Sequence, residues 1–130
     1  MKLLCIATYF LVLLYSGAKG DTIEDISHIL TKCYEEYPIS DDEFTTLINE
    51  VHPYNEKTKC FEKCIAEELG WFKDGVLMSN VVVPTLSHDF SLNEDVVRQF
   101  TQECRTLVGS SRCDTVYRIS QCLHTKVHKL

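Results

Sequence analysis

From residue 22 onward, apolar residues recur at intervals of three and four. This spacing is typical of one face of an amphipathic α-helix. In residues 22–37 the repeating positions are Ile23, Ile26, Leu30, Cys33 and Tyr37. Because proline cannot continue a helix, Pro38 ends the segment. The pattern predicts a first helix over residues 22–37.

The next two helices are predicted from their capping residues as well as from their apolar faces. Ser40 and Glu43 form a capping box that opens the second helix. Its apolar face comprises Phe44, Leu47, Ile48 and Val51, and it ends before Pro53. The third helix is predicted from Asn55, a favourable N-cap, to Leu69, with Gly70 in the left-handed position after it.

Two further helices are predicted near the carboxyl end. Ser91 and Glu94 open one of them, which ends at Gly109. Its predicted inner face comprises Val97, Phe100, Cys104 and Leu107. Ser111 and Asp114 open the last helix, which continues through Cys113, Tyr117 and Cys122. No Asn-Gly hairpin signal and no sustained alternation of apolar and polar residues favours a sheet, so the fold class is all-α.

The stretch from Trp71 to Phe90 carries conflicting signals. Lys73-Asp74-Gly75 has the composition of a turn. Val81-Val82-Val83 favours a strand, because β-branched side chains suit a pleated surface. Pro84 leaves room only for a short helix or an irregular segment. We interpret this stretch as a short helix.

The first 20 residues have the features of a secretory signal peptide. Lys2 precedes an apolar run from Leu3 to Tyr15, and small residues at Ala18 and Gly20 fit cleavage after Gly20. The run is shorter than the roughly 20 apolar residues that span a bilayer. We therefore expect a signal peptide at 1–20, one helical domain at 21–130, and a secreted, extracellular protein.

The remaining chain is acidic. Removal of Lys2 and Lys19 leaves 11 basic against 19 acidic residues, a net charge of −8. Such a chain is repelled by phosphate backbones, so nucleic acid is excluded as a default partner, as are anionic membranes. A domain of this size buries a limited core and often needs covalent cross-links.

The cysteines supply these cross-links. Cys5 leaves with the signal peptide, and six remain: Cys33, Cys60, Cys64, Cys104, Cys113 and Cys122. An even number in a short secreted chain predicts three disulfides. The alternative is a zinc site at Cys60 and Cys64, but no second cysteine or histidine pair completes it, so no metal is predicted.

Cysteine spacing restricts the disulfide pairing without fixing it. Cys60 and Cys64 share one face of a helix, so they must reach different partners. Cys113 and Cys122 are nine residues apart, which places them on opposite sides of a helix. We therefore expect the last helix to be held from both sides and to lie centrally in the fold.

The cysteine order, Cys33-x26-Cys60-x3-Cys64-x39-Cys104-x8-Cys113-x8-Cys122, resembles that of the insect odorant-binding proteins, in the pheromone-binding and general odorant-binding group. The resemblance spans essentially the whole chain after the signal peptide. It implies a compact bundle of about six helices around an apolar cavity. It also implies the disulfides Cys33–Cys64, Cys60–Cys113 and Cys104–Cys122.

The resemblance also implies a set of ligand-binding positions. They are Ile23, Ile26, Trp71, Val83, Leu86, Val97, Phe100, Thr101, Tyr117 and Leu123. Ordinary core packing is the alternative for each of them. Thr101 and Tyr117 carry hydroxyls that need a partner in an apolar cavity, and a ligand alcohol or carbonyl can be that partner. Trp71 adds a large rigid face with one donor.

No catalytic constellation emerges from the sequence. The five histidines lie beside no serine or cysteine in a nucleophile motif. His88-Asp89 would suggest a secreted phospholipase, but the flanking cysteines and glycine-rich calcium loop of that family are missing, so we interpret it as a solvated turn. We expect no enzyme activity, no catalytic residue and no cofactor.

Two functions remain open at this point. The first is a carrier for a small hydrophobic ligand such as an odorant or pheromone, with a membrane receptor or a second copy of the chain as further partners. The second is a secreted interaction protein that acts through its surface, its cavity vestigial.

The sequence of the carboxyl end is compatible with two structures. Leu123, Val127 and Leu130 recur at four and three, so a helical extension could cover the cavity mouth, with His124 and His128 near their ordinary pKa of about 6.5. The other alternative is a frayed basic tail.

Overall fold

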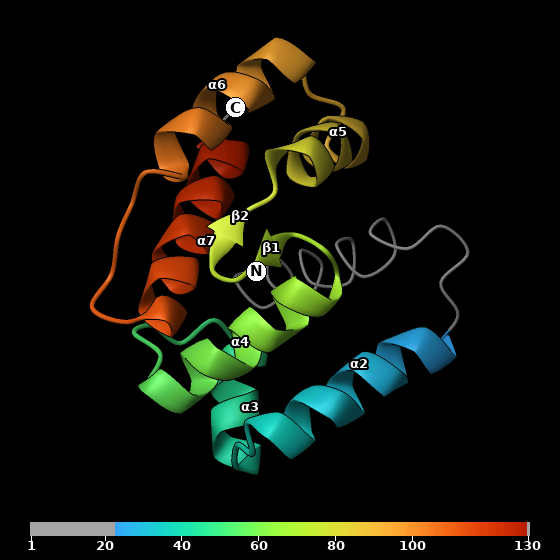
Figure 1. Cartoon of the computed structure of the whole chain (residues 1–130), viewed down its shortest axis with the longest axis vertical. Helices are drawn as coiled ribbons and strands as arrows, with labels where there is room; N and C mark the ends of the chain where they lie inside the picture. Colours follow the sequence, from blue (N-terminus) through green and yellow to red (C-terminus); the bar gives the residue numbers. More distant parts are fainter. Residues whose placement is uncertain (1–22, 130) are drawn as a thin grey trace.

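The computed structural model describes residues 23–129, with side chains from Ser27 onward. The predicted signal peptide, 1–20, lies outside the described residues. Within them the chain forms six helices and one two-stranded hairpin (Figure 1). The elements are α2 (Ile23–Glu36), α3 (Asp41–Ile48), α4 (Glu56–Glu68), β1 (Phe72–Lys73), β2 (Val76–Leu77), α5 (Ser79–Asp89), α6 (Glu94–Cys104) and α7 (Arg112–Lys129). None of these described helices is long and apolar enough to cross a membrane.

The predicted caps of α3 and α4 are present. The Ser40 hydroxyl accepts from the Glu43 backbone N–H at 3.1 Å, and the Glu43 carboxylate accepts from the Ser40 N–H at 2.9 Å. Asn55 accepts from the Thr58 N–H at 2.9 Å and opens α4. Gly70 follows α4 with a φ of 82°, where the two backbone hydrogen bonds of a Schellman motif close the helix. These local signals therefore fix the bounds of α4 as predicted.

Helix α3 ends earlier than predicted, and the prediction that Val51 belongs to its buried face is wrong. The helix ends at Ile48, and Asn49 is its C-cap. Glu50 then adopts a φ of 60°, in the left-handed region. This break rotates Val51 away from the core, and it is exposed.

Helix α6 is shorter at both ends than predicted. Its N-cap is Asn93, whose side chain accepts from two N–H groups of the next turn at 2.8 and 3.3 Å. Ser91, the predicted cap, has a φ of 51° and belongs to the preceding turn. The helix ends at Cys104, and the Thr106 hydroxyl donates to a carbonyl three residues earlier, a local bond that competes with helix continuation. Leu107 is consequently outside α6 and exposed.

The stretch from Trp71 to Phe90 contains a hairpin that was not predicted. Strands β1 and β2 pair antiparallel across Asp74 and Gly75, which have φ values of 53° and 81°. Asp-Gly is a favoured pair where both central residues of a hairpin turn need positive φ. The predicted helix is present as α5, with Pro84 inside it, and it has 11 residues. Its three valines pack as helix residues, so burial outweighed their strand preference.

The disulfides confirm the pairing that the resemblance implied. They are Cys33–Cys64, Cys60–Cys113 and Cys104–Cys122. The first joins α2 to α4, and the other two join α7 to α4 and to α6. Only five of the 18 residues of α7 are exposed. Helix α7 is therefore central, as predicted.

The amino-terminal helices are held together by aromatic packing. The Tyr34 ring of α2 lies 4.9 Å from the Phe61 ring of α4 and 5.8 Å from the Phe44 ring of α3, measured between centroids. Phe61 is fully buried. Tilted and edge-on ring pairs of this kind stabilise beyond the area that they bury. The other part of the core lies among α5, α6 and the carboxyl half of α7.

Candidate ligand-binding site

Most of the predicted ligand positions lie in one buried region. Those that are buried are Trp71, Val83, Leu86, Val97, Phe100, Thr101 and Leu123. They come from the segment after α4 and from α5, α6 and α7. Tyr117 is half-buried against the same core. Ile23 and Ile26 lie in α2, but their side chains are outside the described residues. The fold thus gathers residues that are about 50 positions apart in the sequence.

Two of the predicted ligand positions carry a buried polar atom that lacks a hydrogen-bond partner. Trp71 Nε1 and Thr101 Oγ1 are buried and make no hydrogen bond within the described part of the chain. A helical threonine commonly donates to a carbonyl one turn earlier, as Thr85 does to Val81 at 2.7 Å. A buried polar group without a partner costs about 1–3 kcal/mol. Both atoms are therefore free to bond to an oxygen atom of a bound molecule.

Tyr117 differs from Thr101 because its hydroxyl already has a partner. The Tyr117 oxygen lies 2.7 Å from Nδ1 of His52. The Tyr117 ring also packs against the Tyr54 ring at 5.2 Å, and the Lys59 ammonium lies 4.8 Å from its centroid. The sequence-based expectation of a hydroxyl in need of a ligand therefore fits Thr101 and not Tyr117.

A polar cluster beside this region was missed by the sequence analysis. We call it the Glu50 cluster: Glu50, His52, Tyr54, Glu62 and His124. Glu50 Oε1 lies 3.1 Å from Nε2 of His124 and 3.9 Å from Nε2 of His52. The cluster joins the α3–α4 connection to α4 and α7. Its members are spread over about 75 positions, and no spacing in the sequence links them.

Burial shifts the protonation of this cluster. The pKa of Glu62 is raised to about 8, first by burial and then by the charge of Glu50. The pKa of His124 is lowered to about 4 by burial, with smaller contributions from His128 and His52. Burial also lowers the pKa of His52 and raises that of Tyr54. At neutral pH the cluster therefore holds a largely protonated Glu62 and neutral imidazoles.

The carboxyl end continues α7 as a helix. Leu123 and Val127 are buried, so the frayed-tail alternative is wrong for residues up to Lys129. Leu130, the third position of the predicted stripe, lies outside the described residues. An ordinary pKa for His124 is also wrong, because its burial disfavours the charged ring. A gating role for this segment stays a prediction.

A second buried polar group, Asp114, holds α7 to its neighbours. Its Oδ1 lies 2.7 Å from the Lys59 ammonium of α4, and its Oδ2 accepts from Arg118 Nε at 2.8 Å. The Ser110 backbone N–H donates to Oδ2 at 2.9 Å. The Arg118 hydrogen bond, followed by that of Lys59, holds the pKa of Asp114 well below its usual range. Asp114 is thus a structural ion-pair centre, whereas the sequence indicated only a helix cap.

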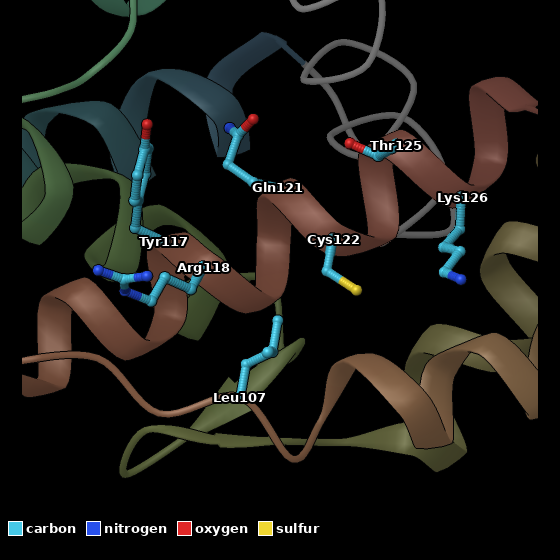
Figure 2. A pocket seen from close by; sticks show the side chains of 7 residues that line it. All are labelled: Leu107, Tyr117, Arg118, Gln121, Cys122, Thr125 and Lys126. Carbon is cyan, nitrogen blue, oxygen red and sulfur yellow. The ribbon is translucent and has the colours of Figure 1, made fainter.

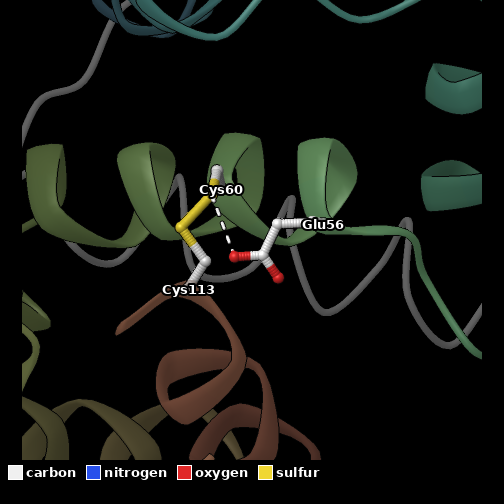
Figure 3. Close-up of side chains that lie close together, drawn as sticks. All are labelled: Glu56, Cys60 and Cys113. Atoms are coloured by element: carbon white, nitrogen blue, oxygen red, sulfur yellow. Dashed lines mark hydrogen bonds between the residues drawn. A yellow bond between two sulfur atoms is a disulfide. The ribbon is translucent and has the colours of Figure 1, made fainter. Parts of the chain in front are cut away.

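Among the described residues, one group of side chains lies close enough together to hold a metal ion. Its two cysteines cannot bind the metal as thiolates. Atoms of Glu56, Cys60 and Cys113 lie within 4.8 Å of one another (Figure 3). Cys60 and Cys113 form a disulfide with each other, and Cys64 is bonded to Cys33. The zinc alternative at Cys60 and Cys64 is therefore wrong, because zinc needs deprotonated thiols.

The pair His88-Asp89 is not the solvated turn that we predicted. Both residues end helix α5, with His88 exposed and the Asp89 side chain mostly buried. Their Nδ1 and Oδ1 atoms lie 3.2 Å apart. Because His88 is fully solvated on a helix end, the pair shows no enclosed environment of the kind that tunes a catalytic dyad.

Comparison with known proteins identifies the family. The PBP/GOBP family model matches residues 18–126. General odorant-binding protein 56a of Drosophila melanogaster is 28% identical over 95 residues, covering 72% of this chain and 67% of that protein. The structure of a fatty acid binding protein, OBP56a from the oral disk of the blowfly Phormia regina, matches with a TM-score of 0.71 and 30% identity, over 85% of this chain and 97% of that chain. The chain therefore belongs to the PBP/GOBP family, whose members are binding proteins.

Proposed function

We propose that this protein is a secreted, non-enzymatic carrier that binds one small hydrophobic molecule among α5, α6, α7 and the segment after α4. The observation that carries the proposal is the pair of unpartnered polar atoms, Trp71 Nε1 and Thr101 Oγ1, among the buried and mainly apolar ligand positions. Ordinary core residues are hydrogen-bonded when they are polar. A bound oxygen atom supplies the missing partner.

The proposed ligand has an alkyl body and one oxygen-containing group. The blowfly relative is named as a fatty acid binding protein, and the fruit fly relative as an odorant-binding protein. A medium-chain alcohol, aldehyde, ester or acid suits the apolar lining and the two polar atoms. Ile23 and Ile26 belong to the proposed lining on the strength of the family resemblance alone.

Secretion supports this role. The predicted signal peptide at 1–20 directs the chain to an oxidising compartment, and the three disulfides are stable there. We include a membrane receptor or a second copy of the chain as partners that can receive the ligand.

The proposal predicts micromolar binding of medium-chain ligands. Burial contributes about 0.8 kcal/mol per CH₂ group, less several kcal/mol for lost freedom, which gives a net value of about −8 kcal/mol. Displacement of a fluorescent apolar probe by a panel of alcohols, esters, aldehydes and acids measures it. If no member of the panel binds more tightly than millimolar, the protein acts through its surface instead of as a carrier.

Replacement of Thr101 by valine tests the polar anchor. The change keeps the shape of the side chain and removes a hydroxyl that has no partner in the free protein, so stability is expected to rise by up to about 1 kcal/mol. Affinity for dodecanol is expected to fall about five- to tenfold, while affinity for the corresponding alkane is unchanged. Probe displacement by both ligands measures this difference.

Thr85→Val is the matched control. The Thr85 hydroxyl donates to the Val81 carbonyl at 2.7 Å, so it already has a partner within the helix. This variant is expected to lose about 1 kcal/mol of stability and to keep the ratio of alcohol to alkane affinity. Equal loss of alcohol affinity in both variants would show that Thr101 does not bond to the ligand.

A further inference from the structure

A surface groove runs along α7 outside the buried region. It has a volume of about 460 Å³, and it is lined by Leu107, Tyr117, Arg118, Gln121, Cys122, Thr125 and Lys126. Figure 2 shows the Leu107 side chain pointing from the α6–α7 connection toward α7, between Arg118 and Cys122. The volume falls in the range of small-molecule sites. The groove is thus large enough for one chain-like ligand.

The groove has a cation at each end. Arg118 and Lys126 are eight residues apart on α7, about 12 Å along the helix axis. Arg118 donates from Nε to Asp114, and no hydrogen bond among residues 27–129 uses its two terminal nitrogens. Lys126 lies 3.0 Å from a Glu103 oxygen and is also partly exposed. The planar fork of Arg118 is therefore open to a carboxylate, which it can bind through two parallel hydrogen bonds.

Between these cations the groove is mainly apolar, with Gln121 and Thr125 as its polar lining residues. Leu107 is 39% exposed, and the Cys122 sulfur is bonded to Cys104 and carries no charge. The methylene stem of Lys126 can cover an alkyl chain while its ammonium stays in water. An alkyl chain laid from Arg118 toward Lys126 thus contacts Leu107 and the Cys122 sulfur, and passes Gln121 and Thr125.

The charged residues that line the groove, Arg118 and Lys126, are both basic, which favours an anionic ligand. Residues 105–130 hold five basic residues and one acid, the buried Asp114. The preceding part of the chain, from residue 21 to residue 104, holds six basic and 18 acidic residues. Because exposed charges are screened beyond about 8 Å at physiological salt, an anion in the groove responds first to Arg118 and Lys126 and to Asp114 and Glu103, with which they pair.

We propose that this groove is a second binding site, for a single-chain amphiphile with a carboxylate head. The carboxylate binds the Arg118 fork, and the alkyl chain lies along Leu107 and Cys122 toward Lys126. This site opens on the surface of α7, shares only Tyr117 with the predicted ligand positions, and does not require the carrier site to be occupied. It distinguishes acids from alcohols, because only a carboxylate satisfies the charge and the two donors of Arg118.

The test is a comparison of dodecanoate with dodecanol by titration calorimetry and native mass spectrometry. The wild-type protein is expected to bind two molecules of dodecanoate and one of dodecanol. Leu107→Asp places a negative charge on the groove floor, so it is expected to bind one molecule of each. Val108→Asp is the matched control, because Val108 is the neighbouring residue, is 80% exposed and does not line the groove. This variant is expected to bind two molecules of dodecanoate.

A further variant separates recognition from charge. Arg118→Lys keeps the cation and removes the planar fork, so the second dodecanoate is expected to bind about tenfold more weakly, with dodecanol unchanged. Wild-type protein that binds only one dodecanoate, or a Leu107→Asp variant that still binds two, would overturn the proposal. Failure of the proposed carrier site gives a different result. In that case the wild-type protein does not bind dodecanol, but it still binds the one dodecanoate molecule that Leu107→Asp removes.

Discussion

Replacement of Asp114 by alanine is expected to lower the melting temperature by more than about 10 °C. The Asp114 side chain is only 3% exposed, and it holds Lys59, which is 17% exposed, and Arg118. Without the carboxylate, Lys59 is left poorly solvated with no carboxylate to balance its charge. Removal of one partner from a buried ion pair is much more costly than removal of both. Thermal unfolding followed by circular dichroism measures the effect.

The effect should also depend on pH. The neighbouring guanidinium and ammonium hold the pKa of Asp114 below its ordinary value of 3.8 in the folded protein. Its stabilisation is therefore fully present above pH 3.8 and is lost as the pH falls below that value. Wild type and Asp114→Ala should consequently converge in strong acid. A constant difference at all pH values would contradict an ionic origin.

Glu103→Gln is the control for the loss of a surface ion pair. Glu103 lies 3.0 Å from Lys126, and both side chains are about half exposed. Exposed pairs contribute about 0–1 kcal/mol, so this variant should melt within a few degrees of wild type. If Asp114→Ala melts as this control does, Asp114 does not hold α4 and α7 together.

Local signals in the sequence predicted a helix boundary correctly where one residue determines that boundary. Ser40 and Asn55 cap α3 and α4 because their side chains accept hydrogen bonds from the first turn. Gly70 ends α4 because only a residue that tolerates positive φ closes a Schellman motif. The cysteine spacing identified the family, and with it the disulfide pairing, over most of the chain.

Competition between neighbouring signals explains the errors in the predicted elements. Ser91 and Asn93 are both good N-caps, and tertiary packing selected Asn93. Asp74-Gly75 is a hairpin signal equivalent to Asn-Gly, and we interpreted it only as a turn. Val51 fitted the period of α3, but the helix had already ended at Ile48.

The candidate site was only partly visible in the sequence, for a different reason. Apolar periodicity indicated that Val97 and Phe100 face inward, and they are buried. The Glu50 cluster consists of residues that are normally solvated, such as Glu62 on α4 and His124 on α7. Only tertiary packing brings them together and removes water from them. No pattern in one chain distinguishes them from surface residues.

Replacement of Glu62 by glutamine is expected to stabilise the protein progressively as the pH rises from 4.5 to about 8. The ordinary pKa of this carboxyl is 4.5, and burial and Glu50 raise it to about 8 in the folded protein. Between these values the unfolded chain releases a proton that the folded chain retains. The free energy of unfolding of the wild-type protein therefore falls by about 1.4 kcal/mol per pH unit. The total loss is on the order of 3 kcal/mol by pH 7. Glutamine does not ionise, so the variant lacks this loss.

Urea unfolding at several pH values from 4.5 to 8.5 measures the difference between the two proteins. His124 also titrates in this interval, since its lowered pKa removes stability as the pH falls through 6.5. Because both proteins contain His124, its contribution cancels in the difference. Glu35→Gln, on an exposed position of α2, is the control and should follow the wild-type curve. Parallel curves for wild type and Glu62→Gln would show that Glu62 ionises normally in the folded protein.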